Sequence, residues 1–403
     1  ALKIDGRSYS PKVLETAMFC AARDPAYKLA AETLQETAEI QISARHLRNI
    51  AVKIGGELES ARDAKTEAYF QQPLPRIPTT PSTPIALACV SVDGGRTQTR
   101  LDGGPNGVQE PHWRETKNAV FMRMTGVHFD NDPHPALPEC FRDRKYMKKL
   151  LSGIVDEEDV DSTGPEKSDL KSWRPERLFR TCLSSLCDSD SFGRMMEAEA
   201  DSRGFFTAQK RAFVSDGLQY NWTIQKRHFP EFIPILDFPH AIERAYEAAR
   251  AVCLDSEEAW TCYVKWASAC WEGRVEDMLE EMRRYQETMG HPPQDCDEKD
   301  PRKLLAEAIT YFENNASRMN YPRYRKEGLP LTSAYMESFV KEMNYRVKGT
   351  EKFWNDGPSA EAILQLRAAK LSDDQRLRRH MRSRPGNPFR PNVKFNPQMI
   401  NAA

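Results

Sequence analysis

Residues 85–95, with the sequence IALACVSVDGG, decide the fold of this chain. The eight residues from Ile85 to Val92 carry no charge and are mostly apolar, which predicts a buried strand. The strand is expected to end at Asp93, because Asp-Gly-Gly is typical of a turn. Asp93 is therefore both a turn residue and a candidate functional carboxylate at the end of a buried strand.

Two further strands are predicted directly after this one. Residues 96–101 (RTQTRL) favour a polar strand, and residues 118–129 (NAVFMRMTGVHF) favour a third. The Gly-rich stretch Asp102–Pro111 between them indicates an antiparallel meander.

The chain then alternates between helix and strand. Residues 175–203 follow a helical pattern, whereas 211–215 and 233–236 are short apolar runs of strand length. The two runs lead directly into Asp216 and Asp237. This pattern predicts an α/β fold with a mixed sheet flanked by helices.

Residues 10–70 are expected to be helical. Ser43 can cap a helix that ends at Gly55-Gly56, and a helix before a short turn and a capped helix is typical of a helix-turn-helix. Small helical bundles show the same pattern, so DNA contact is one of two interpretations. If it is correct, the outward basic residues Arg45, Arg48 and Lys53 are the candidate DNA contacts.

Changes in composition suggest the domain boundaries. Five prolines in residues 71–84 indicate an extended linker, and residues 255–329 show helical spacing without a strand signal. The expected division is 1–70 helical and DNA-binding, 71–84 linker, 85–254 first part of the α/β domain, 255–329 helical insertion, 330–370 second part, and 371–403 basic tail.

The overall composition is that of a globular protein. Of 403 residues, 39% are hydrophobic and 29% charged, and no run approaches the roughly 18 apolar residues of a membrane helix. The nine cysteines form no CxxC motif, so reduced thiols in a cytoplasmic protein are expected. The formal charge of −1 averages an acidic run at 155–169 with the basic tail, and so does not exclude a nucleic-acid partner.

Three carboxylates stand at informative places. Asp93 and Asp216 follow apolar strands, and Glu337 lies in the first turns of a helix that Ser333 can cap. Carboxylate oxygens are the ligands that Mg²⁺ prefers, and a pair of such ions can promote phosphodiester displacement. An Asp-Gly after a strand is equally common as turn chemistry, so the residues alone leave the two interpretations about even.

Several motifs in a consistent order resemble the DDE transposases of bacterial insertion sequences, of the ISKra type. The resemblance spans roughly residues 10–370. Its main pieces are Val92-Asp93-Gly94-Gly95, Val214-Ser215-Asp216-Gly217, Ile235-Leu236-Asp237-Phe238-Pro239-His240, Met336-Glu337-Ser338 and Asn344-Tyr345-Arg346-Val347-Lys348-Gly349.

The resemblance implies a ribonuclease H-like, retroviral-integrase-like catalytic domain with an all-α insertion. It implies that Asp93, Asp216 and Glu337 bind two Mg²⁺ ions, for which Mn²⁺ can substitute. Asp237 and His240 would be accessory residues, and Asp237 is also a rival of Asp216 as the second ligand. The expected activity is Mg²⁺-dependent cleavage of DNA at transposon ends and strand transfer into target DNA, by a homodimer or larger assembly in the cytoplasm, associated with the nucleoid.

One departure from the family pattern lies just before the glutamate, where a Gly-Ser-Gly-like turn is replaced by Leu331-Thr332-Ser333-Ala334. This motivates an alternative, a domesticated DNA-binding protein without catalysis; a nuclease that cuts without joining is a third possibility. On the Glu337 helix, Lys341 falls at i+4, where it can contact a phosphate or form a salt bridge. Arg346 and Lys348 are further candidate phosphate contacts.

Overall fold

The computed structural model describes residues 9–100, 112–152, 173–349, 353–355 and 358–384. The predicted connection at 102–111, the acidic run at 155–169 and the tail beyond residue 384 lie outside these residues.

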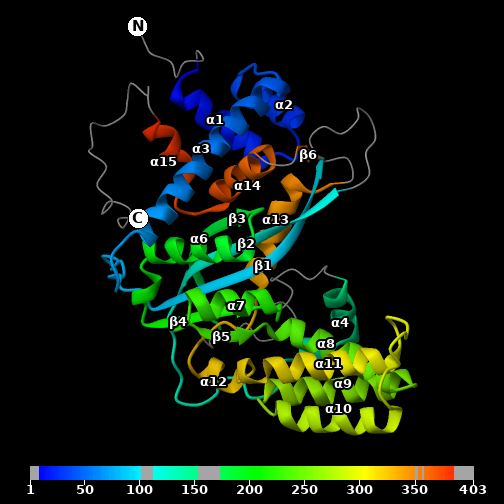
Figure 1. Ribbon diagram of the computed structural model, residues 1–403. Helices are drawn as coiled ribbons and strands as arrows, with labels where there is room; N and C mark the ends of the chain where they lie inside the picture. Colours follow the sequence, from blue (N-terminus) through cyan, green and yellow to red (C-terminus); the bar gives the residue numbers. More distant parts are fainter. Residues whose placement is uncertain (1–8, 101–111, 153–172, 350–352, 356–357, 385–403) are drawn as a thin grey trace.

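A mixed sheet forms the centre of the molecule, with the strand order β3-β2-β1-β4-β5 (Figure 1). The order results from two antiparallel pairs, β1 with β2 and β2 with β3, and two parallel pairs, β1 with β4 and β4 with β5. The strands are β1 Leu87–Arg100, β2 His112–Met124, β3 Arg177–Ser185, β4 Lys210–Ser215 and β5 Ile233–Leu236, and β6 Trp354–Asn355 pairs with the far end of β1.

The first strand is longer than predicted. β1 does not turn at Asp93 but continues to Arg100, so the separate strand expected at 96–101 is wrong. The pairing with β2 is continuous from Leu87 opposite Met124 to Thr99 opposite His112, and these ladder bonds hold the Gly-Gly pair extended. The predicted antiparallel pairing of the neighbouring strand is confirmed, although β2 lies at His112–Met124 and not at 118–129.

The helix predicted across 175–203 is only partly correct. β3 occupies Arg177–Ser185 first, and α6 follows at Ser189–Ser202. The sequence does not predict this strand, because it contains the charged residue Arg180. In the structure Arg180 is only 7% exposed, and its guanidinium donates to Glu342 and to the carbonyl oxygen of Leu371. Tertiary contacts thus allow a charged residue inside a sheet strand.

Helices cover the two faces of the sheet. α6 and α7 (Gln219–His228) lie over the face of β2 that carries Phe121, which packs against Phe205 of η2 (Phe205–Thr207). α13 (Ala334–Val347) lies over the opposite face and contacts β1 and β2. α14 (Pro358–Leu371) packs beside it against β3.

The N-terminal region is helical, as predicted, and consists of α1 Pro11–Arg23, α2 Tyr27–Ala38 and α3 Ala44–Phe70. The third helix does not end at Gly55-Gly56. A Cβ on Gly55 would lie 2.2 Å from the carbonyl oxygen of Ala362, so this glycine allows α3 and α14 to approach closely and does not terminate the helix.

The Pro-rich stretch at 71–84 contains no helix or strand, as expected. It lies along α6, since the backbone nitrogen and hydroxyl of Thr79 both donate to the carboxylate of Asp201.

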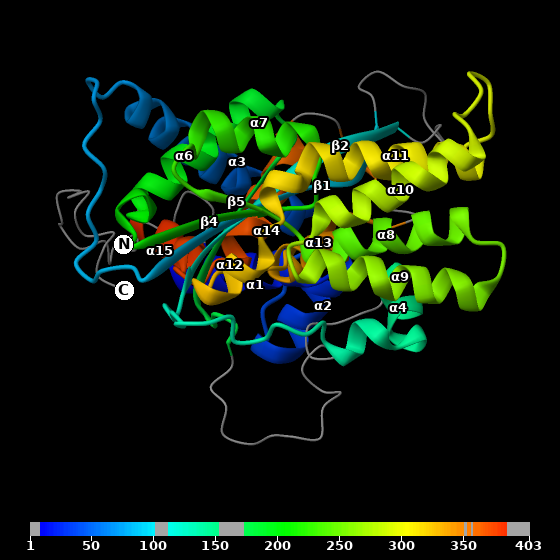
Figure 2. The ribbon, with the colours of Figure 1, turned by 90° about the horizontal axis from the view of Figure 1, so that it is seen from below.

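Residues 255–329 are all described and contain only helices, as predicted. They pack beside α8 (Phe238–Val252), at the opposite end of the sheet from the N-terminal helices (Figures 1 and 2). These helices are α9 Ser256–Trp271, α10 Val275–Met289, α11 Pro301–Asn315, η3 Ala316–Arg318 and α12 Tyr321–Lys326; η1 Glu139–Arg142 and α4 Arg144–Leu151 lie between β2 and β3 in sequence.

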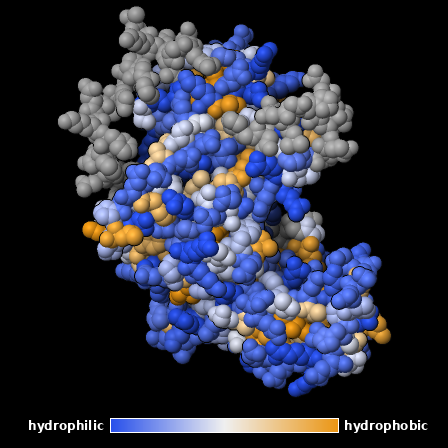
Figure 3. Space-filling view, in the orientation of Figure 1, coloured by the Kyte–Doolittle hydropathy of each residue, from blue (hydrophilic) through white to orange (hydrophobic). Residues whose placement is uncertain are grey.

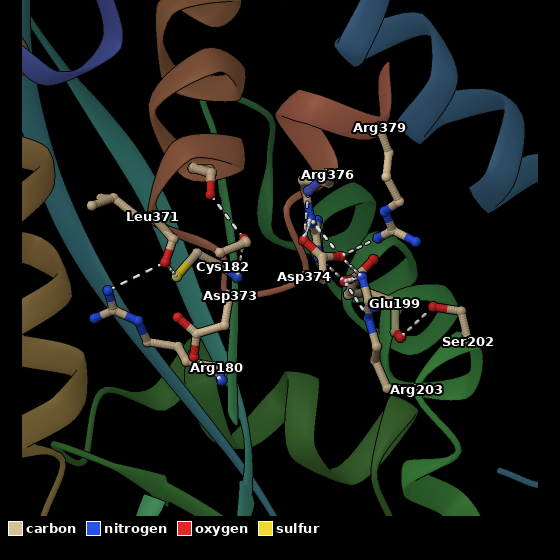
Figure 4. Close-up of polar contacts among 12 residues, drawn as sticks. Arg180, Cys182, Glu199, Ser202, Arg203, Leu371, Asp373, Asp374, Arg376 and Arg379 are labelled. Carbon is tan, nitrogen blue, oxygen red and sulfur yellow. Dashed lines mark hydrogen bonds and ion pairs between the residues drawn. The ribbon is translucent and has the colours of Figure 1, made fainter. Parts of the chain in front are cut away.

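Ion pairs at the buried carboxylate of Glu199 join the C-terminal helix α15 (Arg376–Ser383) to α6 (Figure 4) and also to α3. Glu199 of α6 receives Lys65 of α3 at 2.6 Å and Arg376 of α15 at 2.6 Å. Part of the predicted basic tail is therefore integral to the folded protein.

The outer surface in Figure 3 is mainly hydrophilic, with small hydrophobic patches. All nine cysteines lie in the described part and are free thiols, as expected. None of the described helices is both long enough and apolar enough to cross a membrane.

Candidate metal centre

Three aspartates stand in one row across the sheet. Ser91 of β1 pairs with Val214 of β4, and Ser215 of β4 pairs with Leu236 of β5. Continuing this register by one or two residues places Asp93, Asp216 and Asp237 beside one another at the same level of three parallel strands. Asp93 points to the face of the sheet opposite Phe121, and Asp216 and Asp237 lie beside it, just beyond the ends of β4 and β5.

The row continues onto the antiparallel strands. Asn118 lies opposite Asp93, and Ser184 lies opposite Asn118. The Ser184 hydroxyl donates to the Asn118 side-chain oxygen at 2.7 Å. A polar line thus crosses the five strands β3-β2-β1-β4-β5 at one level, and sequence reasoning missed its two uncharged members.

Glu337 meets this row from helix α13, which lies over the same face. Ligand atoms of Asp237, His240 and Glu337 lie within 4.8 Å of one another, close enough to share one metal ion. Of the residues expected to form the triad, this compact group contains only Glu337. Asp93 and Asp216 stand beside it in the row.

Asp237 is the most deeply buried carboxylate of the group, with 0% exposure. One of its oxygens, Oδ2, accepts from Nδ1 of His240 and from the Ser333 hydroxyl, the latter at 2.8 Å. The other oxygen, Oδ1, has no hydrogen-bond partner among the described residues. A buried carboxylate oxygen of this kind is costly unless a cation or donor satisfies it.

Ser333 has a different role from the one predicted. It stands at the start of α13, but its side chain makes no capping bond to the helix. The hydroxyl bonds to Asp237 instead, so the unusual turn Leu331–Ala334 ties the glutamate helix to the end of β5.

Asp216 and Asp93 are fixed by local bonds. Oδ1 of Asp216 accepts from the Asn221 side-chain nitrogen, the Ser215 hydroxyl and the backbone nitrogen of Leu218, each at 3.1 Å. Oδ1 of Asp93 accepts from the backbone nitrogen of Gly94 at 2.6 Å. Each carboxylate retains a second oxygen that can bind a ligand.

The electrostatics show that these carboxylates lie close together. Burial and the charge of Asp216 raise the pKa of Asp93 to about 7, and the charge of Glu337 adds to this. Burial and the charge of Asp237 also raise the pKa of Glu337, against the opposing effect of His240 and Lys341. Although burial opposes it, the Asp237 carboxylate raises the pKa of His240 to about 10.

Glu243 also belongs to the cluster, and sequence reasoning missed it. Burial raises its pKa to about 7, which the charge of Asp237 increases and that of His240 opposes. It lines a pocket of about 250 Å³ together with Asp216, His240 and Tyr311 of the insertion. The spacing Asp237-x-x-His240-x-x-Glu243 on one helix face could have revealed it.

The insertion reaches the cluster through Tyr311, whose hydroxyl donates to the backbone oxygen of Asp216 at 2.9 Å. Gly217, the next residue, has φ +104°, and a Cβ there would lie 2.8 Å from the Tyr311 ring. The Asp216-Gly217 turn and the insertion are therefore fitted to each other.

The donor set fits divalent cations. Asp93, Asp216, Asp237 and Glu337 offer hard oxygen ligands, and the unpartnered Oδ1 of Asp237 is the observation that most directly calls for a cation. His240, whose pKa is raised to about 10, is protonated at neutral pH and offers a nitrogen ligand only where a bound cation displaces that proton.

The residues predicted to contact DNA differ in their exposure. Arg45, Arg48 and Lys53 are exposed along one side of α3, and Lys341 and Lys348 are exposed on and just after α13.

Arg346, by contrast, is 2% exposed. Its guanidinium donates to the carbonyl oxygens of Ala21 and Pro25 and lies between the rings of Tyr27 and Trp354. Arg346 thus joins α13 to the N-terminal helices and does not offer its charge to a phosphate.

Comparisons with known proteins add little. No family model matches the sequence, and no curated protein is detectably similar. Among solved structures, the chain is similar to the Drosophila P element transposase strand transfer complex, with 10% identity, coverage of 92% of this chain and 93% of the other, and a TM-score of 0.35. A similarity at this level does not establish a common fold.

Proposed function

We propose that the chain is a DDE transposase, a metal-dependent polynucleotidyl transferase that cleaves DNA at transposon ends and transfers the strand into target DNA. The observation that carries this proposal is the row formed by Asp93 within β1 and by Asp216 and Asp237 directly after β4 and β5, met by Glu337 from a helix. The strand order and the helical segment before Glu337 agree with a ribonuclease H-like catalytic domain, the finer description that we propose for this α/β fold.

In this proposal, Asp93, Asp216 and Glu337 hold two Mg²⁺ ions, with Mn²⁺ as a substitute. When bound, such ions supply charge stabilisation to a phosphodiester and lower the pKa of a bound hydroxyl or water. Asp237 anchors His240 and Ser333 and is also within ligand distance of Glu337, so it supports the site or replaces Asp216 as a ligand. The protein contributes mainly positioning and electrostatics.

The DNA surface that we propose has two parts. Exposed basic residues on α3 (Arg45, Arg48, Lys53) form one part, and Lys341 and Lys348 near the carboxylates form the other. We propose a homodimer or larger assembly, because two DNA ends must be paired, and a cytoplasmic location with the nucleoid. The division at 70, 84, 254, 329 and 370 remains our proposal for the domains.

The test is cleavage and strand transfer on DNA that carries the ends flanking the gene, in Mg²⁺ and in Mn²⁺. Asp93→Ala, Asp216→Ala and Glu337→Ala are each expected to lower cleavage at least about 1,000-fold while DNA binding persists, because removal of one group stabilising transition-state charge costs about 10²–10³-fold and a metal ligand more. Full activity in any of the three variants would refute that assignment.

Asp237→Asn and Asp216→Asn decide between the two rival aspartates. The variant of the true ligand loses activity in both metals, whereas the variant of a supporting residue keeps measurable activity. Matched exposed carboxylates, Asp190→Asn and Glu67→Ala, are expected to leave cleavage unchanged.

The altered turn at Leu331–Ala334 favours a specific second candidate, a DNA-binding protein that has lost catalysis. Binding without cleavage in either metal would support it, and cleavage without joining would indicate a nuclease.

A further inference from the structure

An aromatic pocket of about 260 Å³ lies directly behind the carboxylate cluster. Two segments form much of its wall, and each also carries members of the cluster. Phe238 and Pro239 stand between Asp237 and His240, and Thr332, Ala334 and Tyr335 surround Ser333 and precede Glu337. The pocket and the cluster therefore share the same backbone.

The inner wall of the pocket is rigid and apolar. Phe238 contacts Phe141 and Trp271 edge to face, with ring centroids 5.2 and 4.8 Å apart. Trp271 is held from behind by the fully buried Arg325, whose guanidinium lies 4.1 Å from the indole centroid. Met122 and Met124 of β2 provide the floor, on the same face of the sheet as Asp93.

The rim of the pocket differs from the inner wall. Its aromatic residues are half-buried, and an arginine side chain lies over the ring of each. Arg174 lies over the ring of Trp173 at 5.2 Å, and Arg177 lies over the ring of Tyr335 at 4.8 Å. Cations beside flat aromatic surfaces suit a ligand that combines a ring with negative charge.

We propose that this pocket binds one unpaired nucleobase of the DNA strand whose phosphate lies at the carboxylate cluster. The inference rests on the proposed function. The volume is below the roughly 300–1,000 Å³ of pockets for drug-sized ligands and admits a single ring system, not a base pair. The arginines at the rim match the phosphates of that strand, and taking one base out of the stack into such a pocket costs only a few kcal/mol.

Single-stranded 12-mers with one central 2-aminopurine provide the probe, with the full chain in Ca²⁺, which takes oxygen ligands in looser geometry than Mg²⁺. Base uptake is expected to change the fluorescence on binding. Trp173→Ala removes a stacking surface and Ala334→Leu fills the pocket. Both variants are expected to bind the oligonucleotide about tenfold more weakly and to lose the signal, since a stacked base contributes that much affinity.

The two substitutions change volume in opposite directions, so a simple packing defect does not account for the same loss in both. Trp260→Ala is the matched control: Trp260 is a half-buried aromatic residue that lines a different pocket. This variant is expected to retain the affinity and the signal, and thermal unfolding checks that all three variants fold.

Unchanged affinity and signal in both pocket variants would overturn the inference about the pocket. Cleavage by the parent protein would still support the proposed function in that case. The expected signal in a protein without any cleavage would support the pocket and refute the catalytic proposal. If the parent protein does not bind the oligonucleotide, the inference is wrong, and its cleavage of transposon-end DNA decides the proposed function separately.

Discussion

Two clusters of buried carboxylates in this molecule have opposite electrostatics. At the end of the sheet, Asp93, Glu337 and Glu243 have raised pKa values. Between α6 and α15, burial is overcome by arginines, which lower the pKa of Glu199 and of Asp374 (Figure 4), and Lys65 further lowers the pKa of Glu199. Burial is common to both, so the number of cations makes the difference.

The second cluster is fully compensated. Glu199 and Asp374 are contacted by four cations, Lys65, Arg203, Arg376 and Arg379, at distances from 2.5 to 3.1 Å. In the first, His240 is bonded to Asp237 and Lys341 lies near Glu337, while five carboxylates share the site. We infer that the first cluster is arranged to receive positive charge and that the second serves stability.

The largest effect on stability is expected from Glu199→Ala. The substitution takes one carboxylate from the buried Arg203 and from the partly exposed Lys65 and Arg376, while Asp374 still binds the two arginines. The expected cost is therefore about 3 kcal/mol, the lower end for breaking a buried ion pair. Denaturant unfolding measures this loss.

Glu67→Ala is the control on the neighbouring helix, because Glu67 is 61% exposed and its contact with Arg194 is 3.8 Å long. It is expected to cost less than about 1 kcal/mol. Equal losses of unfolding free energy in the two variants would mean that the ion pairs of Glu199 contribute no more to stability than an exposed pair does.

In contrast to Glu199→Ala, the substitution Asp93→Asn is expected to increase the free energy of unfolding of the metal-free protein at pH 8. Because the folded pKa of Asp93 is raised from 3.8 to about 7, its contribution to stability is complete below pH 4 and is lost as the pH rises through 7. Removing the charge is therefore expected to stabilise the metal-free protein at pH 8 by about 2 kcal/mol, and to flatten the pH dependence between 4 and 7.

Unfolding in EDTA at several pH values measures the effect. Asp190→Asn, at an exposed aspartate, should leave the slope unchanged. A loss of stability in Asp93→Asn at pH 8 would contradict the description of the first cluster as under-compensated.

The effect of added Mg²⁺ on the free energy of unfolding is a third way to distinguish the two clusters. It is expected to stabilise the parent protein by about 1–2 kcal/mol at concentrations ten- to thirtyfold above its dissociation constant. The shift should be larger at pH 8 than at pH 5.5, since protons compete for Asp93 as the pH falls below its pKa of about 7. The same scan on Asp93→Asn should show a smaller shift, and on Glu67→Ala an unchanged one.

Much of the fold could be predicted from the sequence because its core strands are unusually apolar. Composition alone predicts the strands ending at Ser215 and Leu236 and the all-helical segment 255–329. β3 could not be found in this way, because Arg180 is neutralised by Glu342, which is 162 residues away in sequence. The length of α3 depends similarly on its contact with Ala362.

The candidate site was predictable in its residue types and less so in its grouping. The spacing along the chain does not indicate that Asp93, Asp216 and Asp237 stand at one level, because this depends on strand register. Nor does it show that Ser333 binds Asp237 instead of capping α13, or that Arg346 is buried against α1 and α2. Each of these depends on contacts between residues far apart in sequence.

The smallest effect is expected at the edge of the compensated cluster, where Glu57 of α3 binds His380 of α15 and Arg384, the residue directly after this helix. Nε2 of His380 lies 3.0 Å and Nε of Arg384 lies 2.7 Å from Glu57 Oε2. These bonds, against the cost of burial, lower the pKa of Glu57 to about 2, so their contribution is present above pH 4.5 and is lost as the pH falls towards 2.

Glu57→Gln is expected to lower the local opening free energy of α15 by about 0.5–1 kcal/mol, because the site is partly exposed. Hydrogen exchange of the α15 amides measures it, and global unfolding should hardly change while Arg376 remains bound to Glu199. Glu15→Gln, which removes a single contact to Arg378 at 3.2 Å, should have a smaller effect still. If Glu57→Gln instead lowered global stability as much as Glu199→Ala, the attachment of α15 would depend on its exposed end, and the contrast between the two carboxylate clusters would no longer explain what holds the C-terminal helix in place.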